Sequence, residues 1–177
     1  EVLQLSKVRD ASTSEETYMD VIRGKTAMLF EASSHSAAVL AGADAEQAEA
    51  LRVFGDHLGV AFQLMDDLLD YRGDAQAMGK NVGDDLAEGK PTLPLIHAMR
   101  EGTPAQAELV RKAIQQGGSQ DLESIRAAVE AAGSLDYTAQ LARHYAEKAI
   151  QCLSTLPASQ YRDALTELTR FAVARSN

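Results

Sequence analysis

Apolar side chains recur at helical spacing along most of the chain, and the breaks between apolar runs mark where helices end. Ser14, followed by two glutamates, is typical of a helix start, and Ala41-Gly42 is typical of a helix stop. Asp44 suits the capping position of a second helix. The pattern therefore predicts two long helices, at about 15–40 and 45–71.

Residues 72–92 break this pattern with four glycines and a proline, and they predict a long loop with a short helical turn. Loops of this length are often functional. The apolar spacing then returns and predicts helices at about 92–101, 104–116, 121–132, 134–155 and 158–175. No strand alternation, internal repeat or low-complexity segment interrupts them. We predict an all-α fold of long antiparallel helices, in one domain over 1–177.

An acidic strip lies on the second long helix, in the segment GVAFQLMDDLLD at 59–70. At about 100° per residue, Gln63, Asp66, Asp67 and Asp70 fall within an arc of roughly 100°, and apolar side chains fill the rest. Like charges at i,i+3 and i,i+4 destabilise a helix. Such a strip is either solvated surface or a site for a cation, and its apolar flanks favour the cation. Oxygen ligands of this kind suit Mg²⁺.

A metal that recruits phosphate also needs positive side chains nearby. Lys25 precedes Thr26 midway along the first long helix, and Lys80 and Lys90 each follow a glycine in the loop. Each lysine is also compatible with plain surface. The loop does not have P-loop or EF-hand spacing, and the histidines form no metal-binding or triad pattern. Gly59, at the start of the strip, permits close approach of another group.

Composition narrows the possible partners. The net charge of −9, from 17 basic and 26 acidic residues, argues against nucleic acid. No apolar run approaches the roughly 18 residues of a membrane span, and no signal peptide is recognisable. The single cysteine, Cys152, fits a reducing compartment, so we expect a cytoplasmic protein. Because the chain begins at Glu1 without a methionine, we expect a fragment or a processed chain.

Three segments in order resemble the C-terminal half of the trans-isoprenyl diphosphate synthases, within the branch that makes the polyprenyl tails of quinones. They are Lys25-Thr26, the acidic segment at 59–70 and GKNVGDDLAEGKPTLPL at 79–95. The resemblance implies an all-α homodimer with a central cavity. It implies Mg²⁺-assisted, head-to-tail condensation of an allylic diphosphate, such as farnesyl diphosphate, with isopentenyl diphosphate.

The resemblance also implies a role for each matching residue. Asp66 would bind Mg²⁺ directly, and Asp67 and Asp70 would bind it through water or orient it. Lys25 and Lys80 would hold the allylic diphosphate. Thr26 and Gln63 would line the reacting centre. Asp85 and Lys90 would support a closing loop near the substrate.

The family also has a first aspartate-rich motif, which this sequence lacks. We therefore expect the chain to be inactive alone, although it retains the second motif. Three alternatives are a non-catalytic subunit of a two-component synthase, a helical interaction module and a terpene cyclase. The intact aspartates and lysines argue against the first alternative, and the segment Gly89-Lys90-Pro91-Thr92 favours chain elongation over cyclisation.

Overall fold

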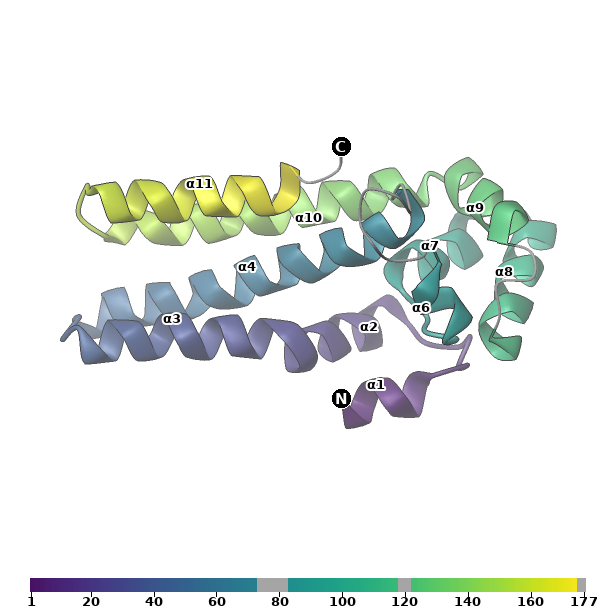
Figure 1. Ribbon diagram of the computed structural model, residues 1–177, viewed down its shortest axis with the longest axis horizontal. Helices are drawn as coiled ribbons and strands as arrows, with labels where there is room; N and C mark the ends of the chain where they lie inside the picture. Colours follow the sequence, from purple (N-terminus) through teal and green to yellow (C-terminus); the bar gives the residue numbers. More distant parts are fainter. Residues whose placement is uncertain (73–82, 118–121, 175–177) are drawn as a thin grey trace. The chain divides into compact units, whose positions relative to one another are not determined.

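The computed structural model describes residues 1–72, 83–117 and 122–174, and these residues form helices and connections without a strand (Figure 1). In chain order the elements are α1 (Val2–Lys7), α2 (Glu15–Ile22), the π-helix η1 (Arg23–Ala27), α3 (Met28–Leu40), α4 (Ala45–Arg72), α6 (Asp84–Ala87), α7 (Leu93–Glu101), α8 (Pro104–Gln116), α9 (Leu122–Ala131), α10 (Ser134–Cys152), the 3₁₀ turn η2 (Leu153–Thr155) and α11 (Gln160–Ala174). The all-α prediction is confirmed.

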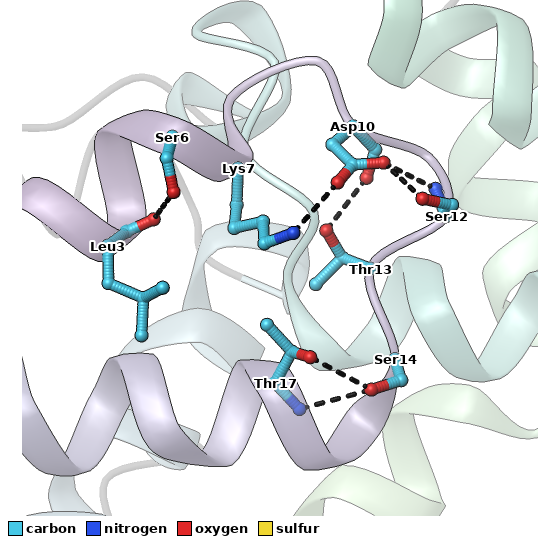
Figure 2. A network of polar contacts seen from close by, with 8 residues as sticks. All are labelled: Leu3, Ser6, Lys7, Asp10, Ser12, Thr13, Ser14 and Thr17. Carbon is cyan, nitrogen blue, oxygen red and sulfur yellow. Dashed lines mark hydrogen bonds and ion pairs between the residues drawn. The ribbon is translucent and has the colours of Figure 1, made fainter.

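Most predicted helix ends are confirmed because local capping fixes them. The Ser14 hydroxyl accepts the backbone N–H of Thr17 at the start of α2, as Figure 2 shows. The Asp44 carboxylate accepts the N–H of Gln47 at the start of α4 over 2.8 Å. Side-chain oxygens at these positions bond backbone donors that the first helical turn leaves without partners.

The predicted first long helix runs from residue 15 to residue 40 without a break, but it is not a regular α-helix throughout. Residues 23–27 form the π-helix η1 between α2 and α3. A π-helix is wider than an α-helix and occurs mostly as a single turn, often at functional sites. This turn carries both Lys25 and Thr26, so the departure from regular helix falls on residues that the sequence had singled out.

The chain divides into two compact units, each made of two segments. Unit 1 comprises Glu1–Val21 and Asp66–Ala139, and unit 2 comprises Ile22–Met65 and the chain from Gln140 onward. The boundaries fall inside helices, so α4 contributes to both units. The prediction of a single domain over 1–177 stays a prediction.

The core of unit 2 is built from α4, α10, η2 and α11. Phe54 and Leu58 of α4 pack with Ala149, Leu153 and Ala172. In Figure 1, α10 and α11 lie side by side, in green and yellow. Ala149 and Ala172 are small and allow α10 and α11 to pack closely against their neighbours in this core.

The core of unit 1 centres on α7, of which residues 93–98 are all buried. This helix packs against α8 and α9. The end of α4 contributes fully buried side chains, including Leu68 and Tyr71. The Tyr71 hydroxyl lies 3.4 Å from that of Thr92, which precedes α7. Asp66, Asp67 and Asp70 are thus on a helix end that is anchored by apolar burial on its other faces.

None of the helices in the described ranges combines the length and the apolar character needed to cross a membrane.

Candidate active-site residues

The acidic strip at the end of α4 is not a solvated surface. Asp67 is only 4% exposed, and Asp66 and Asp70 are partly buried. Burying an ionised carboxylate is costly unless a partner compensates for the lost hydration. The burial therefore supports the interpretation that these side chains are placed for a cation.

The most buried carboxylate has a buried hydrogen-bond donor. The hydroxyl of Tyr18, on α2, donates to Oδ2 of Asp67 over 2.6 Å. Burial, followed by the negative charge of Asp67, raises the pKa of Tyr18 well above its ordinary value. The phenol therefore stays protonated and keeps its donor role.

Asp70 has a different neighbour, the short helix α6. Its carboxylate accepts the backbone N–H of Asp85 over 3.3 Å, and its carbonyl accepts the N–H of Gly83 over 3.0 Å. Gly83 has φ of +86°, which favours glycine at this position. Burial, and then repulsion from the Asp85 carboxylate, raises the pKa of Asp70 from its usual 3.8 to about 6.

Lys90 is engaged by two carboxylates. Its ammonium group lies 2.9 Å from Asp85 and 2.7 Å from Glu88. Burial lowers the pKa of Lys90, but hydrogen bonds to the two carboxylates outweigh this effect and raise it overall. This contact pattern supports the predicted role of Asp85 and Lys90 in holding the turn. Substrate binding by Lys90 stays a prediction, and Lys80 lies outside the described residues.

In unit 2, Thr26 and Gln63 are brought together. The Thr26 hydroxyl donates to Oε1 of Gln63 over 2.6 Å, and Gln63 is 9% exposed. Lys25 is partly buried beside this pair and has no ion-pair partner within the described residues. The pair of residues predicted to line the reacting centre is therefore linked directly, across 37 positions of sequence.

Gly59 explains how η1 and α4 approach so closely. A Cβ atom on Gly59 would lie 2.5 Å from the Cα of Ala27, and one on Gly55 would lie 2.5 Å from the carbonyl oxygen of Phe30. Real Cβ atoms do not come this near to backbone atoms. The predicted close approach at Gly59 is confirmed, and the approaching group is the backbone of the π-helix rather than a ligand.

The carboxylates at the end of α4 fit a Mg²⁺ ion that takes its other ligands from water and substrate phosphate. No three histidine, cysteine or acidic side chains in the described ranges are close enough to hold a metal ion by themselves. Mg²⁺ commonly takes only one or two carboxylates and completes its shell with water and substrate phosphate. The carboxylates of Asp66 and Asp67 match this requirement in chemistry and in number.

Sequence reasoning missed Tyr18. The available signal was its position among the apolar residues Met19 and Ile22, since a buried tyrosine hydroxyl usually has a polar partner. The identity of that partner was not accessible, because Asp67 is 49 positions away.

The comparisons with known proteins agree with one another. The family model described as Polyprenyl synthetase matches residues 1–132. The octaprenyl diphosphate synthase of Haemophilus influenzae is 50% identical over 177 residues, and that of Escherichia coli is 53% identical over 176 residues. A crystal structure of a polyprenyl synthase from Caulobacter crescentus, complexed with calcium and isoprenyl diphosphate, superposes with a TM-score of 0.92 at 44% identity.

These matches cover nearly all of this chain but only part of each relative. Each covers 99% of the chain and 54% of the other protein, and the matched part is the C-terminal half of the octaprenyl diphosphate synthases. The chain belongs to the polyprenyl synthetase family. The two octaprenyl diphosphate synthases named above are prenyltransferases.

Proposed function

We propose that residues 1–177 supply the C-terminal half of the active site of a long-chain polyprenyl diphosphate synthase. The reaction would join isopentenyl diphosphate to an allylic diphosphate such as farnesyl diphosphate, giving a product for quinone side chains. The observation that carries the proposal is the burial of Asp67, which lies next to Asp66 on α4. It occurs in a chain whose sequence is 50% and 53% identical to two octaprenyl diphosphate synthases.

The bonds that change in this reaction define what the residues must do. The allylic C–O bond breaks, and the diphosphate leaves with the electron pair. The double bond of isopentenyl diphosphate then forms the new C–C bond, and a proton is lost. Charge on the departing diphosphate must be stabilised, and the carbocation must be kept from water. Mg²⁺ bound to the diphosphate would supply most of that charge stabilisation.

The chain's own side chains would share this work. We assign diphosphate binding to Lys25, which has no ion-pair partner in the described ranges, and to Lys80. Asp66, Asp67 and Asp70 would hold the Mg²⁺–diphosphate. The linked pair of Thr26 and Gln63 would line the reacting carbons. Asp85 and Lys90 would keep the turn after the loop in place.

We further propose that the chain alone is inactive, because it holds only one of the two aspartate-rich motifs. The test compares residues 1–177 with an extended synthase, defined as residues 1–177 preceded by the N-terminal half of the octaprenyl diphosphate synthase from Escherichia coli. Both are incubated with Mg²⁺, farnesyl diphosphate and labelled isopentenyl diphosphate. We expect prenyl product only from the extended synthase. Product from residues 1–177 alone would refute the inactivity, and no product from either would refute the function.

The role of Asp66 is tested in the extended synthase with Asp66→Ala. We expect at least a roughly 100-fold loss of kcat, since a ligand of the catalytic metal is removed. Stability should not fall, because the change also removes like-charge repulsion from Asp70, one helical turn away. Near-normal turnover with Asp66→Ala would show that the assigned role is wrong. Glu16→Ala is the matched control, because it also removes an acidic side chain, one that is exposed on α2.

We also propose a homodimer. Large apolar side chains are exposed along α3, at Met28, Leu29, Val39 and Leu40, with exposed fractions of 61%, 72%, 59% and 88%. They lie in two pairs, at the two ends of α3, and exposed apolar surface can mark a protein interface. Sedimentation of the extended synthase tests the proposal: we expect a dimer, and Leu29→Glu should shift it toward monomer. A monomeric extended synthase would contradict it.

A further inference from the structure

Two buried side chains in unit 1, which lie 49 positions apart in the sequence, form a donor–acceptor pair. Tyr18 and Asp67 are each 4% exposed, and the Tyr18 hydroxyl lies 2.6 Å from Oδ2 of Asp67. Hydrogen bonds from a hydroxyl to an ionised carboxylate are short and about twice as strong as those between neutral groups. A contact of this strength fixes the plane of the Asp67 carboxylate.

We propose that Tyr18 is a positioning residue, which holds the Asp67 carboxylate in the orientation needed to bind the Mg²⁺–diphosphate. The proposal rests on the proposed function of the acidic strip. With Oδ2 fixed by the phenol, Oδ1 is presented in one direction. Substituting a residue that hydrogen-bonds to a metal ligand typically costs about 10- to 100-fold in metal affinity or activity.

A phenol suits this task better than a cation. Lys90 beside Asp85 shows the alternative, in which an ammonium group is paired with the carboxylate and compensates its charge. Tyr18 orients Asp67 without adding positive charge, so attraction for a divalent cation is preserved.

The segment before Tyr18 fixes its place. The backbone N–H of Tyr18 donates to the carbonyl of Ser14 over 2.9 Å, in the first turn of α2. Before that turn, the Asp10 carboxylate accepts bonds from Lys7 and Ser12. Figure 2 shows this network between α1 and α2 and the Ser14 cap on Thr17. The start of α2 is therefore anchored independently of Asp67.

Tyr71 provides a matched control. It is also a buried tyrosine of unit 1, with 1% of its surface exposed, and its hydroxyl lies 3.4 Å from a neutral hydroxyl, that of Thr92. Tyr18→Phe and Tyr71→Phe remove the same atom from equally buried rings. Only Tyr18→Phe removes a bond to a carboxylate of the acidic strip.

The experiment measures cation binding directly and turnover separately, in the extended synthase. Mn²⁺ is the probe, and its binding is followed by electron paramagnetic resonance in the presence of inorganic diphosphate. We expect Tyr18→Phe to weaken Mn²⁺ binding about 10-fold, and to raise the Mg²⁺ concentration for half-maximal elongation by a similar factor. Tyr71→Phe should stay within about twofold of the unmodified protein in both measurements.

Different outcomes separate the inference from the function on which it rests. Unmodified extended synthase that neither binds Mn²⁺ with diphosphate nor elongates would overturn the proposed function. Normal binding by the unmodified protein, with Tyr18→Phe no weaker than Tyr71→Phe, would overturn the positioning role alone.

A double variant keeps the test open if Tyr18→Phe fails to fold. Tyr18→Phe combined with Asp67→Asn removes the buried charge together with its donor. We expect its Mn²⁺ affinity to equal that of Asp67→Asn alone, because the tyrosine acts only through this carboxylate. A further loss of affinity in the double variant would overturn the proposal.

Discussion

The hydroxyl of Thr26 donates to the side-chain oxygen of Gln63 over 2.6 Å, and this bond ties the π-helix η1 to α4. Both side chains come from unit 2, and both are partly or fully buried. Thr26 lies within the π turn and its hydroxyl reaches α4. The two residues assigned to the reacting centre are therefore linked directly to each other.

Thr26→Val removes this bond while preserving the shape of the side chain. We expect kcat of the extended synthase to fall about 10- to 100-fold, since small misplacements of groups at a reacting centre have effects of this size. Thr26→Ser retains the hydroxyl and should keep most of the activity. Steady-state elongation kinetics check both variants. Equal losses in Thr26→Val and Thr26→Ser would show that the methyl group matters rather than the bond.

Gly59→Ala should destabilise the protein, although alanine favours a helix interior by about 1 kcal/mol over glycine. The new Cβ would lie 2.5 Å from Ala27 Cα, so α4 and η1 would have to separate. We expect a net loss of about 1–3 kcal/mol, which is typical of overpacking. Thermal and denaturant unfolding of the extended synthase provide the measurement.

Gly24→Ala is the control for this steric argument. A Cβ on Gly24 would meet no atom within 4 Å, and Gly24 also lies in η1. We expect no loss of stability. A similar decrease in both variants would mean that the close contact with Ala27 is not the cause.

The pair Asp85 and Lys90 is suited to a double-mutant cycle. Their charged atoms lie 2.9 Å apart, and each side chain is less than a quarter exposed. If the pair holds the turn, Asp85→Asn and Lys90→Gln should be coupled by about 1–2 kcal/mol in stability. Glu88→Gln, at a more exposed carboxylate, should matter less. If Lys90 only binds substrate, Lys90→Gln should instead raise KM for the allylic diphosphate, and the two substitutions should not be coupled in stability.

The raised pKa of Asp70 predicts how stability depends on pH in the metal-free protein. The folded state holds a proton on Asp70 up to about pH 6, whereas the unfolded chain releases it near its usual 3.8. This contribution to stability is therefore complete below about pH 4 and is lost as the pH rises through about 6. The loss should be about 1–2 kcal/mol after allowance for solvent screening of this partly exposed group.

Asp70→Asn isolates this effect, because asparagine stays uncharged and can still accept the N–H of Asp85. In the presence of a chelator, unmodified protein should lose stability relative to Asp70→Asn between pH 4 and 7. Melting curves across this range measure the difference. Parallel curves for the two proteins would contradict the raised pKa. Mg²⁺ should reduce the difference at neutral pH, because it favours the ionised carboxylate.

Local signals in the sequence determined the helices and their ends. Ser14 and Asp44 begin α2 and α4, because a side-chain oxygen at that position bonds the backbone donors of the first turn. Periodicity also placed Asp66, Asp67 and Asp70 on one face of α4, since that relation depends only on 3.6 residues per turn. The three matched motifs indicated the family because each is a contiguous stretch of sequence and can be recognised without the fold.

Only the tertiary structure decided which distant groups meet. The bonds of Tyr18 to Asp67, of Thr26 to Gln63 and of Asp85 to Asp70 join residues 49, 37 and 15 positions apart. Likewise, the need for glycine at Gly59 depends on how closely η1 and α4 pack. Helical periodicity records which side of a helix is buried, but it does not contain the identity or the distance of the group that buries it.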